Sequence, residues 1–406
     1  MTSPAIRSMG VFPSQRIHQL IRDGAVYADR EGIDLAGQVQ PASIDLSLGT
    51  KAYRLQASFL PQADTVAQRV EELSMYEVDL TQGAILERGA VYLIPLNERL
   101  ALPAHVRAKA NPKSSTGRLD IFTRVITDHC ARFEEIVPGY RGGLFMEVVP
   151  RSFTVKVRTG QRLNQLRFYD MTDGGMSASI RELEIMSRLE FAQGQELQDL
   201  YNQRELLCDG EGRFIGAPDR HLGADGLLMG VNLGGDDDTV IGYKTKKNSK
   251  ALDLDRIGAY RAEDYWEALH PPRRGRLILE PEEFYIFASK ERIRIPLEYA
   301  SEMVEFDAGT GELRTHYAGF FDPGFGHGAH GEIRGTKAVL EVRPHDVPFI
   351  IEDGQILFKM KYEAMTSAPL IHYGAAIGSN YHDQELRLSK LFIKTGAPLP
   401  SGAGKI

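Results

Sequence analysis

Residues 91–103 read VYLIPLNERLALP, and a similar stretch, FYIFASKERIRIP, occupies residues 284–296. The Tyr, the Glu-Arg pair and the closing Pro of the first stretch recur in the second without a gap, each 193 positions later. A second pair, EVVPRSFTVKVRTGQ from Glu147 and EVRPHDVPFIIEDGQ from Glu341, repeats at an offset of 194. Coincidence would not place both pairs at nearly one offset, so the sequence predicts two copies of one domain.

The repeated stretches alternate as β-strands do. Valines alternate with basic residues along TVKVR, residues 154–158, and apolar residues alternate along QILFKMKY, residues 355–362. A period of two is typical of strands whose two faces lie in different surroundings. Gly160 and Gly354 mark turns. Strands punctuated by Gly and Pro predict a mainly β protein, with a sandwich or barrel in each half.

Helical patterns are fewer. SQRIHQLIRDG, residues 14–24, reads as a helix closed by a glycine, and residues 179–206 have apolar side chains at mixed spacings of three and four. We therefore expect a helical connector at residues 179–206, which joins one domain copy at residues 1–178 to a second at residues 207–365. Residues 366–406 form a C-terminal tail.

Composition excludes several classes of protein. The net charge is −7, from 48 basic and 55 acidic side chains, which argues against the cationic stripe that binds nucleic acid. Two cysteines are too few for a disulfide framework or a Cys-rich metal site and suit a reducing compartment. The N-terminal residues lack the apolar stretch of a signal peptide, and no run approaches the roughly 18 apolar residues of a membrane span. We expect a cytoplasmic protein that binds neither nucleic acid nor membranes.

Common nucleotide and metal motifs are missing. The sequence contains no GxxxxGK[ST] phosphate loop. The glycines of FDPGFGHGAHG, residues 321–331, are flanked by strand patterns, so we do not interpret them as the dinucleotide-binding GxGxxG that follows a strand and opens a helix. The sequence also lacks the zinc signatures HExxH and HxE with PCxxC, and we interpret HGAH, residues 327–330, as a loop rather than a metal site. KSSTGR, residues 113–118, places two hydroxyls between two cations. Because turns often contain Ser and Gly for conformational reasons alone, this stretch needs support from the rest of the chain.

Several motifs together resemble the deoxycytidine triphosphate (dCTP) deaminase family, a branch of the trimeric deoxyuridine triphosphatase (dUTPase) fold. The first half carries PASIDLSLG (residues 41–49), ALPAHVRAKANPKSSTGR (101–118) and VPGYRGGLFMEV (137–148). The second half carries HYAGFFDPGFG (316–326), AVLEV (338–342) and the tail NYHDQELRLSK (380–390). The resemblance implies two tandem dUTPase-like domains, each a distorted β-barrel or jelly roll, with few helices.

The resemblance also implies a hydrolase that acts on a cyclic amidine C–N bond and converts dCTP to dUTP and ammonia, in the synthesis of pyrimidine deoxynucleotides. The family uses no catalytic zinc. By resemblance, Ser114 and Arg118 hold the attacking water, and Glu147 or Glu341 is the catalytic glutamate. A carboxylate can supply the required proton transfers, typically worth about 10²- to 10⁴-fold. We expect the neighbouring cation to keep this carboxylate ionised as a base.

The two halves depart from the family pattern in opposite ways. The first half keeps the Ser-Ser-x-x-Arg element but has Val137 where the family has Asp, and ITDHCARFEEI (residues 126–136) replaces its Ala-Gly pocket segment. The second half keeps that pocket but has DAGTGELR, residues 307–314, in place of Ser-Ser-x-x-Arg. Neither half alone carries a complete site.

Because family members build their sites between subunits, we expect a composite site. The first half would contribute Ser114 and Arg118, with Lys113 and Ser115 placed to meet phosphate oxygens. The second half would contribute the residues Ala318, on the backbone that reads the pyrimidine edge, Asp322, which would bind the sugar 3′-hydroxyl, and Glu341. We favour Glu341 over Glu147 as the base because its neighbouring pocket is intact, although either glutamate could instead form a structural ion pair.

The C-terminal residues resemble a lid that the family closes over the triphosphate. Tyr381, Gln384, Ser389 and Lys390 follow the order of that lid, while Asn380 stands where a Lys usually precedes the Tyr. We expect Mg²⁺ to accompany the triphosphate, held mainly by phosphates and waters. The resemblance further implies a homo-oligomer with sites between domains, and it allows feedback inhibition by thymidine triphosphate.

Two other functions fit parts of the pattern. Asp322 could orient water toward the α-phosphorus, as in a dUTP pyrophosphatase or a bifunctional enzyme, whereas the Ser-Ser-x-x-Arg element favours deamination. A non-catalytic nucleotide-binding protein would account for the losses in each half. Random decay would not, however, leave remnants that complement each other.

Overall fold

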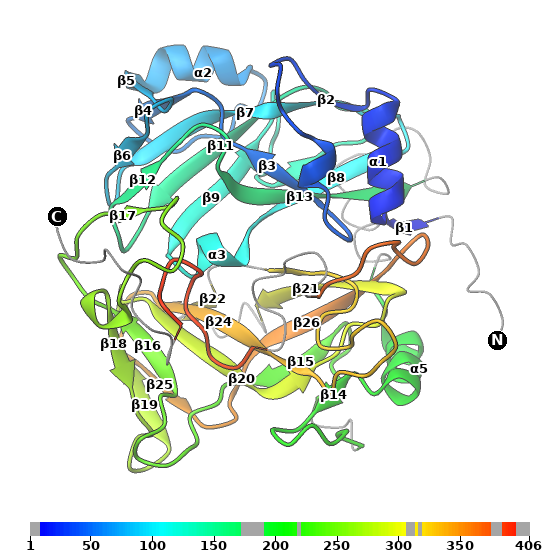
Figure 1. Cartoon of the computed structure of the whole chain (residues 1–406), viewed down its shortest axis with the longest axis vertical. Helices are drawn as coiled ribbons and strands as arrows, with labels where there is room; N and C mark the ends of the chain where they lie inside the picture. The colour runs from blue at the N-terminus through cyan, green and yellow to red at the C-terminus, as the bar shows by residue number, and fades with distance from the viewer. Residues whose placement is uncertain are drawn as a thin grey trace.

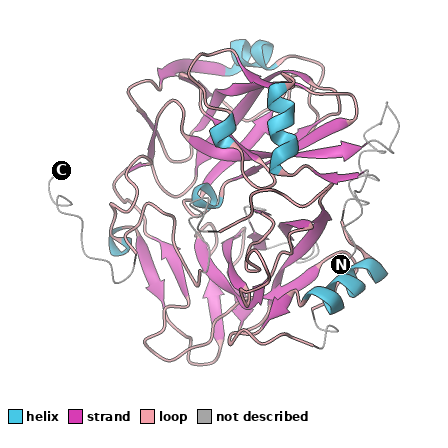
Figure 2. Ribbon diagram, turned by 45° about the vertical axis from the view of Figure 1, so that its right-hand side comes forward, coloured by secondary structure: helices cyan, strands magenta, loops and turns pink. Residues whose placement is uncertain are grey.

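The computed structural model of the chain describes residues 9–171, 191–216, 221–305, 313–315, 319–374 and 384–394. The protein is mainly β, as the sequence predicts, and the strands of each half form stacked sheets on either side of a central junction (Figure 1). The few helices are short, and α1 and α5 lie against the outside of the sheets (Figure 2). The short helix α3 lies instead at the junction.

The strands of the first half are β1 (Met9–Val11), β2 (Val26–Ala28), β3 (Ile44–Ser47), β4 (Lys51–Leu55), β5 (Ser74–Asp79), β6 (Ala84–Leu86), β7 (Val91–Ala101), β8 (Val106–Pro112), β9 (Ile121–Ile126), β10 (Glu135–Ile136), β11 (Arg141–Pro150), β12 (Val155–Val157) and β13 (Arg162–Met171). Their main sheets have the orders β1-β13-β8-β10, with β3 also on β13, and β5-β4-β7-β11-β9, with β2 also on β7.

The strands of the second half are β14 (Leu207–Cys208), β15 (Leu227–Gly230), β16 (Gly242–Thr245), β17 (Leu252–Asp253), β18 (Trp266–Leu269), β19 (Arg276–Leu279), β20 (Tyr285–Ile293), β21 (Tyr299–Glu305), β22 (Leu313–Thr315), β23 (Phe320–Phe321), β24 (Thr336–Pro344), β25 (Phe349–Glu352) and β26 (Ile356–Ala364). Their sheets have the orders β18-β16-β20-β24-β22, with β14 on β20, then β15-β26-β21-β23, and β19-β25. Strand β17 crosses to the first half, where it extends the β12-β6 sheet.

The described helices are α1 (Ser14–Arg22), η1 (Ala36–Gln38), α2 (Val66–Leu73), α3 (Ser114–Gly117), α5 (Gly194–Arg204) and η3 (Ala262–Asp264). The predicted helix at residues 14–24 is confirmed, and Gly24 follows it at a φ of 71°. Helix α5 lies within the predicted connector, whose residues 179–190 fall outside the described ones. Helix α2 was not predicted, although Thr65 and Gln68 form a capping box at its start.

Repeated residues make repeated contacts. The hydroxyl of Tyr92 accepts a hydrogen bond from the amide of Glu87 at 3.2 Å, and that of Tyr285 accepts one from Glu280 at 2.9 Å. At the glycine turns, the side-chain oxygen of Gln161 accepts a bond from Arg158, and that of Gln355 accepts one from Glu352. The two sequence repeats therefore build the same local structure in each half.

The two halves share buried surface at their junction. The core of the first half continues into a group of aromatic side chains from the second, in which Trp266 packs edge to face against Phe153 and Phe392. Across another part of the junction, Lys109 forms an ion pair with Glu302 at 2.7 Å, and Tyr169 donates to Glu363 at 2.8 Å. This packing fixes one half against the other and so fixes any site built between them. In the described part of the chain, no helix has the length and apolarity needed to cross a membrane.

Candidate active site

The KSSTGR stretch forms a tight turn that points from the first half toward the second. Ser114 begins α3, whose four residues end at Gly117, and Arg118 caps the helix by donating its amide to the Ser114 carbonyl at 3.1 Å. The amide of Lys113 donates to the Leu163 carbonyl on β13. One helical turn thereby places Ser114 and Arg118 on the same side of the junction.

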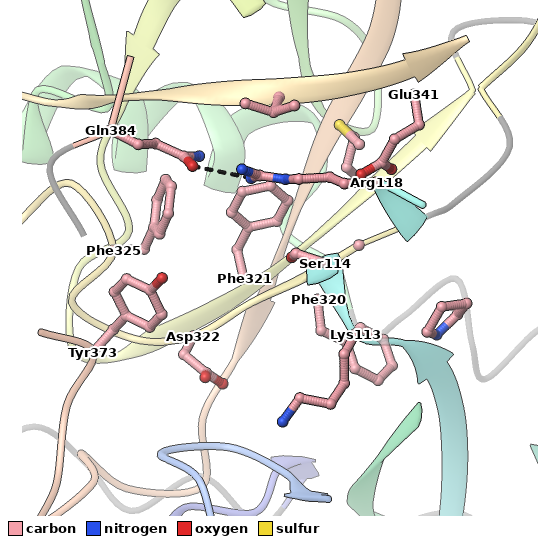
Figure 3. Close-up of a pocket in the computed structure, with 14 residues that line it drawn as sticks. Lys113, Ser114, Arg118, Phe320, Phe321, Asp322, Phe325, Glu341, Tyr373 and Gln384 are labelled. Carbon is pink, nitrogen blue, oxygen red and sulfur yellow. Dashed lines mark hydrogen bonds between the residues drawn. The ribbon is translucent and has the colours of Figure 1, made fainter. Parts of the chain in front are cut away.

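This turn faces strand β24 of the second half across a cavity of about 50 Å³ (Figure 3). The lining residues come from both halves and from the C-terminal segment: Pro112, Lys113, Ser114, Arg118, Met303, Gly319, Phe320, Phe321, Asp322, Phe325, Val339, Glu341, Tyr373 and Gln384. Ser114, Arg118, Asp322 and Glu341, which the sequence predicts to form a composite site, therefore line one cavity.

Glu341 lies in the middle of β24, opposite Ile286 of β20, and only 5% of the residue is exposed. Its pKa is raised from 4.5 to about 8, mainly by burial, which disfavours the charged carboxylate. Arg118 acts in the opposite direction and lowers this pKa, while Asp120 raises it. The expectation that the neighbouring cation keeps the glutamate ionised is thus wrong, because desolvation outweighs the attraction of Arg118.

Arg118 is buried and held by the C-terminal segment. Its Nη2 donates to Oε1 of Gln384 at 2.9 Å, the bond drawn in Figure 3, and its Nη1 donates to the carbonyl of Arg387 at 2.8 Å. The amide nitrogen of the Gln384 side chain, Nε2, donates to the carbonyl of Lys337 on β24 at 3.0 Å. Gln384 therefore links the arginine of the first half to the strand that carries Glu341.

A larger cavity of about 530 Å³ adjoins the first, and Lys113, Ser114 and Asp322 line both. Burial raises the pKa of Asp322 to about 6, while Arg167 opposes this rise. Lys113 forms a short ion pair with Asp45. Polar residues at the wall of the larger cavity include Gln40, Asp45, Ser115, Gln161, Arg162, Asp255, Ser389 and Lys390.

Glu147 lies away from both cavities. Its Oε1 accepts a hydrogen bond from Nε of Arg124 at 3.0 Å, and a hydroxyl of Ser58 accepts from the same guanidinium. Nearby, Ile126 and Cys130, from the segment that replaces the family pocket, pack in a buried apolar cluster. The position in the first half that corresponds to Glu341 thus holds a structural ion pair beside a filled pocket.

The described part of the C-terminal tail closes one side of the larger cavity. The hydroxyl of Ser389 donates to the carbonyl of Ser115 at 3.0 Å, and the Lys390 carbonyl accepts from the amide of Gly258. Burial and the positive charge of Lys113 lower the pKa of Lys390. Two of the predicted site residues, Ala318 and Tyr381, lie outside the described residues.

Sequence reasoning missed part of this wall. Asp45 lies within the PASIDLSLG motif, and Arg162 directly follows the repeated Gly-Gln turn. Their places in or beside these motifs could have identified both residues as candidates for the site. Asp255 follows β17, and its carboxylate binds Gln161 at 2.5 Å and Arg158 at 2.6 Å. No motif marks Asp255, because its position depends on how the second half crosses to the first.

The described residues contain no group of three or more His, Cys, Asp or Glu side chains able to hold a metal ion. In the HGAH stretch, Nδ1 of His327 instead contacts the carbonyl of Gly328 at 2.8 Å. Both cysteines, Cys130 and Cys208, are buried, and burial raises the pKa of each thiol. Neither thiol therefore has the thiolate character of a reactive cysteine.

Comparison with known proteins shows the family of the chain. Residues 8–172 match the model of the 2′-deoxycytidine 5′-triphosphate deaminase N-terminal domain, and residues 193–392 match that of the C-terminal domain. The crystal structure of 2′-deoxycytidine 5′-triphosphate deaminase from Agrobacterium tumefaciens is similar, with 42% sequence identity and a TM-score of 0.76. That similarity covers 88% of this chain and all of the other.

Shorter relatives match as well. A dCTP deaminase of Haloarcula marismortui is 31% identical over 140 residues, which cover 33% of this chain and 67% of the relative. A dUMP-forming dCTP deaminase of Coprothermobacter proteolyticus is 28% identical over 134 residues, or 32% of this chain and 68% of the relative. The fold places the chain in the class of dUTPase-like β proteins. More specifically, the chain belongs to the dCTP deaminase family.

Proposed function

We propose that this protein hydrolyses dCTP to dUTP and ammonia at the cavity between its two halves. The observation that carries the proposal is the convergence of Ser114 and Arg118 from the first half with Glu341 and Asp322 from the second. The family motifs are divided between the two halves of the sequence, and residues from both sets of motifs line this one cavity. The names of the similar proteins support dCTP as the substrate.

In the proposed reaction, water attacks C4 of cytosine. The ionised form of Glu341, which becomes more abundant as the pH approaches about 8, accepts a proton from this water and delivers it to N3, which gives a tetrahedral intermediate. A second transfer through Glu341 moves the proton of the new hydroxyl to the amino group, which leaves as ammonia and creates the C4 carbonyl. A carboxyl with a pKa of about 8 suits both steps, because it accepts and releases a proton near neutral pH.

Ser114 and Arg118 would orient the attacking water. The serine hydroxyl both donates and accepts hydrogen bonds, so it can hold water while the guanidinium stabilises negative charge that develops on the attacking oxygen. Burial strengthens these interactions because little water competes for them. The hydrogen bonds that Arg118 donates to Gln384 and to the Arg387 carbonyl hold the guanidinium in place.

The larger cavity suits the sugar and triphosphate. Lys113, Arg162 and Lys390 bring positive charge to its wall, and Ser115 and Gln161 add polar groups. Asp322 lines both cavities, and in this proposal it binds the sugar 3′-hydroxyl. Mg²⁺ would neutralise phosphate charge. In this proposal the ion is held mainly by phosphates and water.

A second candidate reaction is deamination followed by release of pyrophosphate. Several relatives are named dUMP-forming dCTP deaminases, and Asp322 lies where the cavity for the base meets the cavity for the phosphates. Feedback by thymidine triphosphate and assembly into a homo-oligomer stay predictions from the family resemblance.

Product analysis tests the proposal. Purified protein is incubated with dCTP and Mg²⁺ in the presence of a zinc-specific chelator, and nucleotides are separated by ion-exchange chromatography. Accumulation of dUTP and ammonia supports deamination, and dUMP with pyrophosphate indicates the bifunctional reaction. Binding of dCTP without any change in the base would contradict both and identify a non-catalytic nucleotide-binding protein.

A further inference from the structure

A buried ion pair joins the two halves two residues along the chain from two of the proposed catalytic groups. Asp120 follows Arg118 by two residues, and Arg343 follows Glu341 by two residues on β24. The Asp120 carboxylate accepts a short hydrogen bond from Nη2 of Arg343 and one of 2.6 Å from the hydroxyl of Ser152. Asp120 is fully buried, and Arg343 is 3% exposed.

Asp120 adopts a backbone conformation that favours glycine. Its φ is 53°, in the left-handed region, where aspartate is tolerated but costs more than glycine. Its amide donates to the Gly117 carbonyl at 2.8 Å, and its carbonyl accepts from Arg151 at 2.8 Å. The turn itself would therefore form at least as well with glycine, so the backbone does not account for the carboxylate.

Arg343 is tied to its own half at the same time. Its Nη1 donates a short bond to the carbonyl of Glu282 in the second half. Its Nη2 also lies 3.3 Å from the hydroxyl of Ser152, which belongs to the first half. Side chains two apart on a strand point to the same face, so Glu341 and Arg343 both face the first half. The pair consequently connects the end of the Ser114–Arg118 turn to the strand of the proposed base.

We propose that Asp120 and Arg343 are positioning residues that set the place of Arg118 relative to Glu341. The proposal rests on the function proposed above and extends it, since it explains how two halves of a composite site stay in register. A buried ion pair is a poor source of stability, because desolvation offsets much of the attraction between its charges. It does fix geometry, and an error of 1 Å between reacting groups can cost about 10²-fold in rate.

Three variants of the full chain separate positioning from stability. Asp120→Asn keeps a hydrogen-bond acceptor and tolerates the left-handed backbone, but it removes the charge. The double variant Asp120→Gly/Arg343→Met removes both charges, so neither is left buried and unpaired. The matched control, Arg151→Gln, breaks the exposed pair between Arg151 and Glu282 at the same junction and leaves the contacts of Arg343 with Glu282 in place.

The parent is assayed first, so an inactive parent would refute the proposed function without bearing on the ion pair. In an active background, Asp120→Asn is expected to lower kcat about 10-fold with less than about a threefold change in KM. Two charged groups act on Glu341, namely Arg118 and Asp120. Loss of the Asp120 charge should therefore move the acid limb of the kcat/KM profile to lower pH.

The double variant Asp120→Gly/Arg343→Met shows whether the ion pair positions the catalytic groups or only stabilises the fold. Positioning predicts that its urea midpoint stays close to that of the parent while kcat remains about 10-fold low. If the double variant instead had both the kcat and the urea midpoint of the parent, the proposal would be overturned, and the role of the ion pair would be structural only. The proposal would also fall if Asp120→Asn gave the same kcat and pH profile as Arg151→Gln.

Discussion

Replacing Glu341 with glutamine should abolish deamination and also stabilise the fold at alkaline pH. Burial raises the pKa of this carboxyl to about 8 in the folded protein, whereas in the unfolded chain it ionises near its ordinary value of about 4.5. Between these two pH values the unfolded chain binds fewer protons than the folded protein. The free energy of unfolding of the parent therefore falls as the pH rises.

The size of the effect follows from the two pKa values. A folded-state pKa of about 8 against 4.5 corresponds to about 5 kcal/mol of lost stability at pH 8 and above, and to no loss below pH 4. Glutamine does not titrate, but its buried amide costs about 1 to 3 kcal/mol if it lacks partners. Glu341→Gln should thus be about 2 to 4 kcal/mol more stable than the parent at pH 8.5.

Urea titrations at pH 5 and pH 8.5 measure this difference, and Glu147→Gln is the matched control. Glu147 is equally buried at the corresponding position of the repeat, but its carboxylate is paired with Arg124. Removing that charge leaves the partly buried Arg124 without its ion-pair partner and should destabilise the fold by about 1 to 3 kcal/mol. The two glutamates are therefore expected to respond with opposite signs at pH 8.5. An equal stability difference between Glu341→Gln and the parent at both pH values would refute the reasoning.

Three further predictions concern the C-terminal segment. Gln384→Ala removes the partner of Arg118 Nη2 and should lower kcat/KM about 10-fold in steady-state assays, as expected for loss of a charge-assisted hydrogen bond. Phe392→Ala removes a buried ring, at a cost of about 3 to 5 kcal/mol, and should make residues 384–394 sensitive to limited proteolysis. Lys390→Ala should raise the KM for dCTP and weaken the salt dependence of that KM, because one positive charge leaves the wall of the larger cavity.

The alternating, repeated stretches were enough to predict the mainly β fold, whereas the group of residues that meets at the junction was predicted from the resemblance to the dCTP deaminase family. The second half has no counterparts of Ser114 and Arg118, and the first half has no counterpart of Asp322. Only a site built from both halves could therefore contain all three residues. That inference needed no coordinates, because it compared each copy with the motif pattern of the family. The structure places these groups around one cavity.

Other features could not be predicted, because they depend on packing between distant segments. Arg124 pairs with Glu147 across neighbouring strands, and Asp120 meets Arg343 across 223 positions of sequence. No motif specifies either contact. The charge state of Glu341 was misjudged for a related reason: the sequence shows the nearby cation, but the depth of burial that outweighs it emerges only when both halves close around the carboxyl.

The most direct test of the composite site compares dCTP turnover by the parent, Glu341→Gln and Glu147→Gln at pH 7.5, with dCTP binding measured in parallel by calorimetry. We predict that Glu341→Gln binds dCTP but loses at least about 10²-fold in kcat, as expected for removal of a general acid-base group. Glu147→Gln should keep the kcat of the parent once its folded fraction is taken into account. Loss of turnover in Glu147→Gln with full activity in Glu341→Gln would contradict the account and place the chemistry within the first half.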